Sequence, residues 1–209
     1  MHRLTLIFLL SFLLVPLTAC GLTGGPLEGK VLEAGTNKPI PGAIVVVRWT
    51  GSLFAFAESQ TKCVHVETAT TDAQGHYKIA LWVGTFPGLI QDLRPDVTAY
   101  KTGYVRSPEY FKQQSYRKNV ELLEVFKGAS GERLKQLRQM NSATGCGAAG
   151  ESKMNQKLFA KALYEEALTI AKTVEEKKMV DNLLFSLEII ELGYEAAERR
   201  DIDRSRGRK

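Results

Sequence analysis

Residues 38–49 read KPIPGAIVVVRW, and this stretch decides the fold predicted for the first half of the chain. Pro41 and Gly42 form a turn that leads into a near-continuous run of β-branched residues, and Gly51 ends that run. β-Branched residues pack well on a pleated sheet, and a run of this length between turn residues is typical of a strand. The pattern therefore predicts a β-strand over Ala43–Trp49.

Other short segments on both sides have the same character, each rich in apolar residues and bounded by turn residues. They are Gly29–Glu33, Cys63–Thr70, Tyr77–Leu81, Asp96–Tyr100 and Val120–Val125. The sequence Asp72-Ala73-Gln74-Gly75 is a turn, so the segments before and after it are predicted to form a hairpin. Short strands at this spacing predict a β-sandwich over residues 27–126.

The alternation within residues 63–70 predicts which side chains share a face of that strand. One face holds Val64 and Val66, and the other holds Cys63, His65 and Glu67. The Cys63 side chain is therefore expected to point away from the sandwich core.

Four motifs follow one another in the sandwich segment. They are Gly29-Lys30-Val31, Lys38 to Ala43 leading into Val45 and Val47, Thr71-Asp72 through Gly75-His76-Tyr77, and Lys101-Thr102-Gly103-Tyr104. Together they resemble the carboxypeptidase regulatory-like domain, a transthyretin-like sandwich of seven strands found in many bacterial surface proteins. The resemblance implies an accessory domain without catalysis, and its core would be filled by Val45, Val47, Tyr77 and Ile79. The chain departs from the family pattern over residues 51–62 and 84–95, where it is longer and richer in aromatic residues.

The first twenty residues have the three zones of an export signal. Arg3 gives a positive start, and residues 4–15 form an apolar run that is too short to span a bilayer comfortably. The ending Leu17-Thr18-Ala19-Cys20 resembles the bacterial lipobox. This resemblance implies removal of residues 1–19, lipid attachment to Cys20, and a short lipidated tether over residues 20–26. A plain secretory signal with a chance cysteine at its end is the alternative.

The residue after Cys20 bears on which membrane would hold the protein. In Gram-negative lipoproteins an aspartate there commonly signals inner-membrane retention, and this chain has Gly21. The resemblance therefore implies a lipid-anchored protein of the outer membrane, on its periplasmic side, and the inner membrane is the alternative. An exported chain is not expected to bind nucleic acid.

No catalytic residue, metal ion or cofactor is expected. Once the signal is removed, His65 and His76 are the remaining histidines, and the proposed hairpin separates them by roughly 15 Å. Neither begins an HxxE or HExxH pattern, and the histidine-rich constellation of transthyretin-like hydrolases is missing. Each histidine is expected to lie on the surface, and the chain is not expected to be an enzyme.

Aromatic residues suggest a binding surface. Phe54 and Phe56 follow Gly51 and Ser52 in a predicted loop, where flat rings can stack on sugars or meet a protein partner. These two residues are the candidate binding residues. Trp49 and Trp82, in contrast, are expected to cap the sandwich core.

Cys63 and Cys146 are the cysteines left after lipidation, an even pair in a compartment where disulfides persist. We expect a disulfide that pins the flexible stretch of residues 142–147 onto the sandwich. Closing a loop this long adds about 4 kcal/mol in the chain-entropy model. Two free thiols with separate fates are the alternative, because Cys–Cys geometry cannot be read from sequence.

Beyond Lys127 the strand signal stops and helical periodicity begins. Residues 127–150 are predicted to be a linker with a short helix over Glu132–Met140. Residues 151–198 carry two apolar stripes around the polar run Glu175-Glu176-Lys177-Lys178, which predicts a helical hairpin. One long helix is the alternative. The pair faintly resembles a tetratricopeptide unit through Ala162, Tyr164 and Ala167.

Residues 199–209 carry six basic and two acidic residues and almost nothing apolar, which predicts a disordered basic tail. Because Arg3 leaves with the signal, this tail accounts for the net positive charge of the mature chain. The tail would either touch anionic lipid head groups or lipopolysaccharide, or serve as a solvated end.

The predicted fold is thus α+β, a transthyretin-like sandwich followed by a helical segment. The function predicted first is a non-catalytic, membrane-anchored envelope lipoprotein that binds a protein or an envelope polymer. An inhibitor or immunity-type lipoprotein against a periplasmic hydrolase is the second hypothesis, with residues 51–59 entering the cleft of the enzyme. An unrecognised hydrolase is the third.

Overall fold

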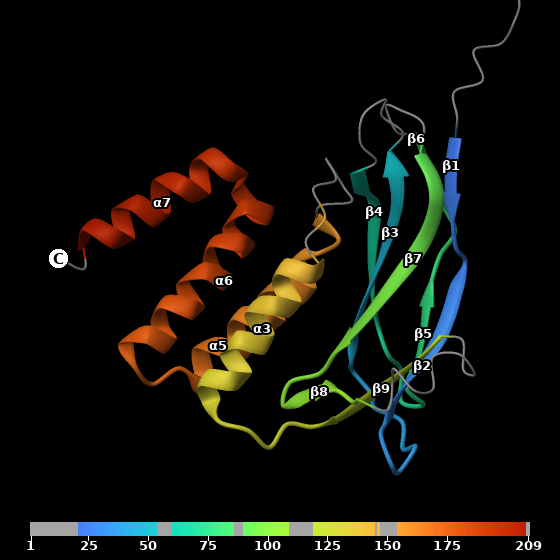
Figure 1. Ribbon diagram of the computed structural model, residues 1–209, viewed down its shortest axis with the longest axis horizontal. Coiled ribbons are helices and arrows are strands. Elements are labelled where there is room, and N and C mark those ends of the chain that lie inside the picture. Colours follow the sequence, from blue (N-terminus) through green and yellow to red (C-terminus); the bar gives the residue numbers. More distant parts are fainter. Residues whose placement is uncertain are drawn as a thin grey trace, which may run out of the picture.

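The computed structural model describes residues 21–53, 60–85, 90–108, 119–144, 146 and 154–207. Within these ranges nine strands form three sheets, and four helices follow them in the chain (Figure 1). The predicted α+β class is therefore confirmed. None of the described helices is long and apolar enough to cross a membrane.

Two sheets face each other and a short ribbon completes them. The larger sheet has the order β5 (His76–Ile79), β2 (Leu27–Glu33), β9 (Val120–Val125) and β8 (Tyr104–Arg106). The second has the order β4 (Gln60–Thr70), β3 (Ile44–Leu53) and β7 (Ile90–Tyr100). The ribbon pairs β1 (Gly21–Gly24) with β6 (Trp82–Thr85). All pairs are antiparallel except β2 with β9.

Strand β3 is buried on both faces, which explains its continuous β-branched sequence. Val45 and Val47 face the four-stranded sheet, whereas Val46 faces the helices, and all three are fully buried. The core between the sheets includes Val45, Val47, Tyr77 and Ile79, as predicted. The predicted strand over residues 43–49 is confirmed, and it extends to Leu53.

The predicted hairpin of residues 63–70 and 77–81 is wrong, because β4 and β5 belong to different sheets. Thr71 carries the chain from one sheet to the other: its hydroxyl donates to the Ile40 carbonyl at 2.7 Å and accepts from the Ala43 amide at 2.8 Å. Asp72 then accepts hydrogen bonds from the amides of Gln74 and His76. The turn was recognised correctly, but it joins two layers of the sandwich.

Cys63 points away from the sandwich core, as predicted, but the predicted grouping of Val64 with Val66 on one face of β4 is wrong, because the strand contains a bulge. Trp49 pairs with His65 and Thr50 pairs with Cys63, which leaves Val64 as the extra residue. An extra residue in one strand reverses the alternation beyond it. Cys63 therefore lies on the same side as Val66, against the helices, while Val64 packs on the sandwich core.

The predicted tether of residues 20–26 is largely a strand. β1 begins at Gly21 and pairs with β6 along all four of its residues. Gly24 lets β1 approach the core closely, because a Cβ there would lie 2.3 Å from Nε1 of Trp49 and 2.4 Å from Nε1 of Trp82. A strand this short, rich in glycine and without alternation gives no recognisable sequence pattern.

The helices are α3 (Ser130–Thr144), α5 (Lys157–Ile170), α6 (Val174–Leu192) and α7 (Tyr194–Gly207). They lie on the side of the three-stranded sheet, with α7 farthest from it, packed on α6 (Figure 1). Helix α3 is longer than predicted. A second core joins Val46, Val66 and Tyr100 of the sheet to Leu137, Phe159 and other side chains of the helices. The helical segment therefore packs on the sandwich of its own chain.

The two-helix interpretation of the apolar stripes holds, but the turn comes earlier than the polar run. Thr173 caps α6 through a capping box, since its hydroxyl accepts from the Glu176 amide and the Glu176 carboxylate accepts from the Thr173 amide. The run Glu175–Lys178 forms the first turn of α6 instead of the loop. Acidic residues there favour the positive end of the helix dipole.

The predicted disordered tail is wrong for residues 199–207, which belong to α7. Ala197 is fully buried, and the guanidinium of Arg204 donates two hydrogen bonds, of 2.6 and 2.8 Å, to the carboxylate of Glu188 on α6. Composition alone suggested disorder because it does not reveal this pairing with a buried carboxylate on another helix.

We predict that Glu188→Gln loosens α7, because the amide removes the charged partner of Arg204 on α6 and leaves only the pair with Asp201 within α7 itself. The expected loss is about 1.5 kcal/mol, with faster amide hydrogen exchange confined to residues 195–206. Glu191→Gln, on the more exposed side of the same helix, removes the ion pair with Lys157 and should change stability by less than about 0.5 kcal/mol. Equal exchange rates in the two variants would contradict the role of Glu188.

Candidate functional site

The structure brings together one pair of the predicted site residues. Cys63 and Cys146 form a disulfide with a Cα–Cα distance of 5.4 Å, so the predicted bridge is confirmed. Cys20, Phe54 and Phe56 lie outside the described residues. The bridge joins β4 to the chain that follows α3, and it therefore ties the sandwich to the helical layer.

The backbone of Cys146 is also held in place, by hydrogen bonds to the Gln156 side chain. The Gln156 side chain accepts from the Cys146 amide at 3.0 Å and donates to the Cys146 carbonyl at 3.1 Å. Next to it, Asn155 donates to the Val66 carbonyl of β4 at 3.0 Å. The start of the α5 segment is thus fastened to the sheet beside the disulfide.

A second set of contacts, an ion pair with its hydrogen bonds, joins β7, α3 and α5. Arg133 and Glu166 are both buried and form a two-pronged ion pair, with Nε–Oε1 at 2.8 Å and Nη2–Oε2 at 2.9 Å. The Tyr100 hydroxyl donates to Glu166 Oε2 at 2.7 Å, and the Gly103 amide donates to Oε1 at 3.2 Å. The Arg133 guanidinium also lies over the Phe126 ring, 5.7 Å from its centroid.

These contacts shift two pKa values in opposite directions. Burial opposes the charged form of Glu166, but the hydrogen bonds from Arg133 and Tyr100 outweigh it and lower the pKa of that carboxyl. Burial raises the pKa of the Tyr100 phenol, and the neighbouring Glu166 carboxylate adds to that shift. Glu166 is therefore ionised and Tyr100 neutral at physiological pH.

Sequence reasoning missed this network, although a signal was present. Glu166 falls on the apolar stripe of its helix beside Leu163 and Ala167, and Arg133 precedes the buried Leu134. Ionised residues at core positions are rare unless they are paired. A carboxylate and a guanidinium that both interrupt apolar stripes are therefore candidates for partners.

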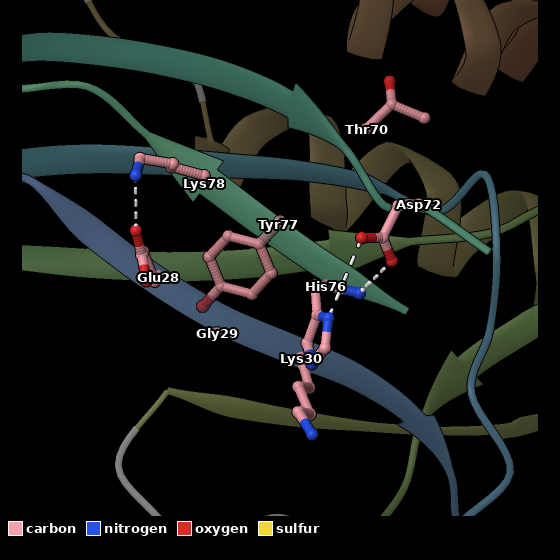
Figure 2. A pocket seen from close by; sticks show the side chains of 8 residues that line it. All are labelled: Glu28, Gly29, Lys30, Thr70, Asp72, His76, Tyr77 and Lys78. Carbon is pink, nitrogen blue, oxygen red and sulfur yellow. Dashed lines mark hydrogen bonds and ion pairs between the residues drawn. The ribbon is translucent and has the colours of Figure 1, made fainter. Parts of the chain in front are cut away.

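An open groove of about 680 Å³ lies along the edge of the four-stranded sheet (Figure 2). Four of its charged side chains lie close together as two pairs. Lys78 reaches Glu28 at 2.7 Å, and the His76 ring points toward Asp72, with a closest nitrogen–oxygen distance of 3.7 Å. Asp72 is already engaged by backbone amides of its turn, so this groove has the character of a solvated strand edge.

A smaller cavity of about 310 Å³ lies between the sandwich and α3, with Arg106 and Arg133 in its lining. Both guanidinium groups are matched by buried carboxylates, Arg106 by Glu121 at 3.1 Å and Arg133 by Glu166. The cavity therefore offers no net charge to an anion. Its position at the junction of the two cores marks it as a packing feature.

The two histidines lie apart in different surroundings. His76 is half-exposed, as predicted, but the prediction of a surface position is wrong for His65. The His65 ring stacks on Trp82 with centroids 4.2 Å apart and contacts the Glu67 carboxylate at 2.9 Å. Among the described residues, no cluster of three or more His, Cys, Asp or Glu side chains is arranged to hold a metal ion.

Trp49 and Trp82 are buried and meet edge to face, with ring centroids 5.5 Å apart. Their predicted place in the sandwich core is confirmed. Comparison with known proteins adds no relative: no protein family, no curated protein and no solved structure matches this chain.

We predict that Glu166→Gln costs about 3 kcal/mol, because it leaves the buried Arg133 without a counter-charge. Glu165→Gln on the exposed side of the same helix should cost less than about 0.5 kcal/mol. Urea unfolding with the disulfide intact measures both. A loss no larger than that of Glu165→Gln would show that the ion pair does not stabilise the helical layer.

The lowered pKa of Glu166 also predicts a pH dependence. The stability that this carboxylate contributes is complete above its ordinary value of 4.5 and is lost as the pH falls through its lower folded value. Unfolding between pH 7 and pH 3 should therefore show a steeper acid loss in the wild-type chain than in Glu166→Gln. Parallel curves for the two chains would contradict this assignment.

We predict that replacing Cys63 and Cys146 by serine lowers the free energy of unfolding by about 4 kcal/mol, because the bridge closes a loop across 83 residues. In the exported wild-type chain, alkylation should label these cysteines only after reduction. Equal masses with and without reduction would show that the bridge does not form.

Proposed function

We propose that the protein is a non-catalytic binding module of the bacterial cell envelope, held at a membrane by lipid on Cys20. The Cys63–Cys146 disulfide carries this proposal. Such bonds persist in oxidising compartments outside the cytoplasm, where the export-type sequence of residues 1–19 would send the chain. The lipobox-like residues 17–20 then give the mature protein its anchor.

The sandwich is proposed to be a carboxypeptidase regulatory-like domain. Two motif positions support the resemblance by their backbone geometry. Gly42 and Gly75 have φ values of +63° and +73°, which favour glycine, and a Cβ on Gly75 would lie 2.7 Å from the Val31 carbonyl oxygen. Glycine at these turns is therefore a requirement of the fold that the motifs describe.

The proposed location is the periplasmic side of the outer membrane, because Gly21 follows the lipidated cysteine. The inner membrane is the alternative. The proposed partner is a protein or an envelope polymer, and the proposed contact residues are Phe54 and Phe56. They belong to the segment that joins β3 to β4, the central strand and an edge strand of the disulfide-tied sheet. A segment set on a rigid sheet is a suitable binding loop.

The same observation favours the second candidate, an inhibitor or immunity-type lipoprotein. The predicted loop over residues 51–59 is wrong at its start, because residues 51–53 belong to β3. The remaining segment between β3 and β4 would enter the cleft of a periplasmic hydrolase, as rigidly based loops do in protease inhibitors. Crosslinking in intact envelopes followed by pull-down separates the candidates. A single enzyme bound tightly would support inhibition, and Phe54→Ala with Phe56→Ala should weaken either interaction. Capture that is unchanged in this double variant would contradict the proposed contact residues.

We predict that Cys20→Ala moves the chain from the membrane fraction to the soluble periplasmic fraction, because the lipid supplies the attachment. Gly21→Ala retains the cysteine and meets no atom within 4 Å of its new Cβ, so it is the matched control. A Cys20→Ala chain that still sediments with membranes would contradict lipid anchoring.

A further inference from the structure

The first strand leaves almost no chain between the fold and the proposed anchor. β1 begins at Gly21, so one peptide unit, about 3.8 Å between consecutive Cα atoms, would join the sheet to the proposed lipid site. A flexible tether would let the folded part rotate and move away from the bilayer. Here the folded part begins where the lipid would be attached.

β1 is also held to the sandwich along its length. It pairs with β6 from Gly21 opposite Thr85 to Gly24 opposite Trp82. Leu22 packs against the sandwich core, and Gly24 lies against the indole rings of Trp49 and Trp82. A lipid on Cys20 would therefore be coupled to the orientation of the whole sandwich.

The outer face of this ribbon carries one large apolar side chain, that of Val83, beside the exposed Thr23. Val83 pairs with Thr23 and is 72% exposed, and Leu81, just before β6, is 58% exposed. Val83 lies opposite Thr23, two residues after Gly21. At roughly 3.3 Å per residue, this places Val83 about 7 Å from Gly21 along the strand direction. Figure 1 shows β1 and β6 side by side at one end of the sandwich, away from β8.

We propose that the β1–β6 ribbon lies against the phospholipid bilayer, with Val83 in the head-group layer. This inference rests on the proposed anchor and goes beyond it, since it assigns a protein surface to the membrane and fixes one end of the sandwich there. Val83 is exposed and close to the proposed anchor, so the lipid would provide apolar contact for its side chain.

The test uses the full lipidated chain in vesicles of phosphatidylethanolamine and phosphatidylglycerol that contain brominated lipid. A fluorophore is attached to Val83→Cys or, as the matched control, to Val125→Cys. Val125 is also exposed and ends β9, which runs parallel to β2 and away from β1. We expect severalfold stronger quenching at position 83 than at position 125.

A second variant carries a flexible Gly/Ser spacer of about twelve residues between Cys20 and Gly21, which reaches roughly 20 Å. It should remain membrane-bound and lose the quenching at position 83. Equal quenching at positions 83 and 125, or quenching that survives the spacer, would overturn the proposal. A fluorophore at position 83 shielded from both brominated lipid and a water-soluble quencher would also overturn it, because a protein then covers this face.

Mass spectrometry of the N-terminal peptide separates the two possible failures. Lipidated Cys20 without quenching at position 83 contradicts only the proposed orientation. Cys20 without lipid contradicts the anchor as well, and the proposed function with it.

Discussion

The arrangement of the two layers depends on the carboxylate of Glu166. A buried carboxylate is costly unless hydrogen bonds fill its lone pairs, and here Arg133, Tyr100 and the Gly103 amide supply them. These donors come from α3, from β7 and from the turn after β7. The full set forms only when sheet and helices meet in one register. Apolar contacts between the layers would tolerate sliding, so we infer that this pair specifies their alignment more than it adds to stability.

Strand β3 makes the two layers one folding unit. Its alternate valines belong to different cores, Val45 to the core between the sheets and Val46 to the core under the helices. A change of side-chain volume on one face of the strand therefore disturbs the packing on its other face. The disulfide at Cys63 acts on the neighbouring strand, so the central part of the three-stranded sheet is fixed through both packing and a covalent bond. This rigidity suits the binding role that we propose.

The sequence predicted what depends on local pattern and missed what depends on distant partners. The run of valines in β3, the turn at Asp72 and the helical stripes are local, and each was recognised. The bulge at Val64 was not, because an extra residue in a strand is defined only against its partner strand. The Glu166 network was missed for the same reason, since its members lie far apart in the chain. Pairing of Cys63 with Cys146 was predictable because they are the two cysteines left once Cys20 is assigned to the proposed lipid.

The charged residues of the C-terminal segment also show that composition does not reveal which side chains pair in the fold. The positive charge of the mature chain seemed to reside in a basic tail, yet α7 holds four carboxylates, those of Glu195, Glu198, Asp201 and Asp203, for its four arginines. Arg200 and Arg204 in addition face the buried Glu188. Helix α7 is thus docked on α6, and its formal charges sum to zero. The β1–β6 ribbon with its exposed Val83, next to Cys20, is the surface that we propose for contact with the membrane.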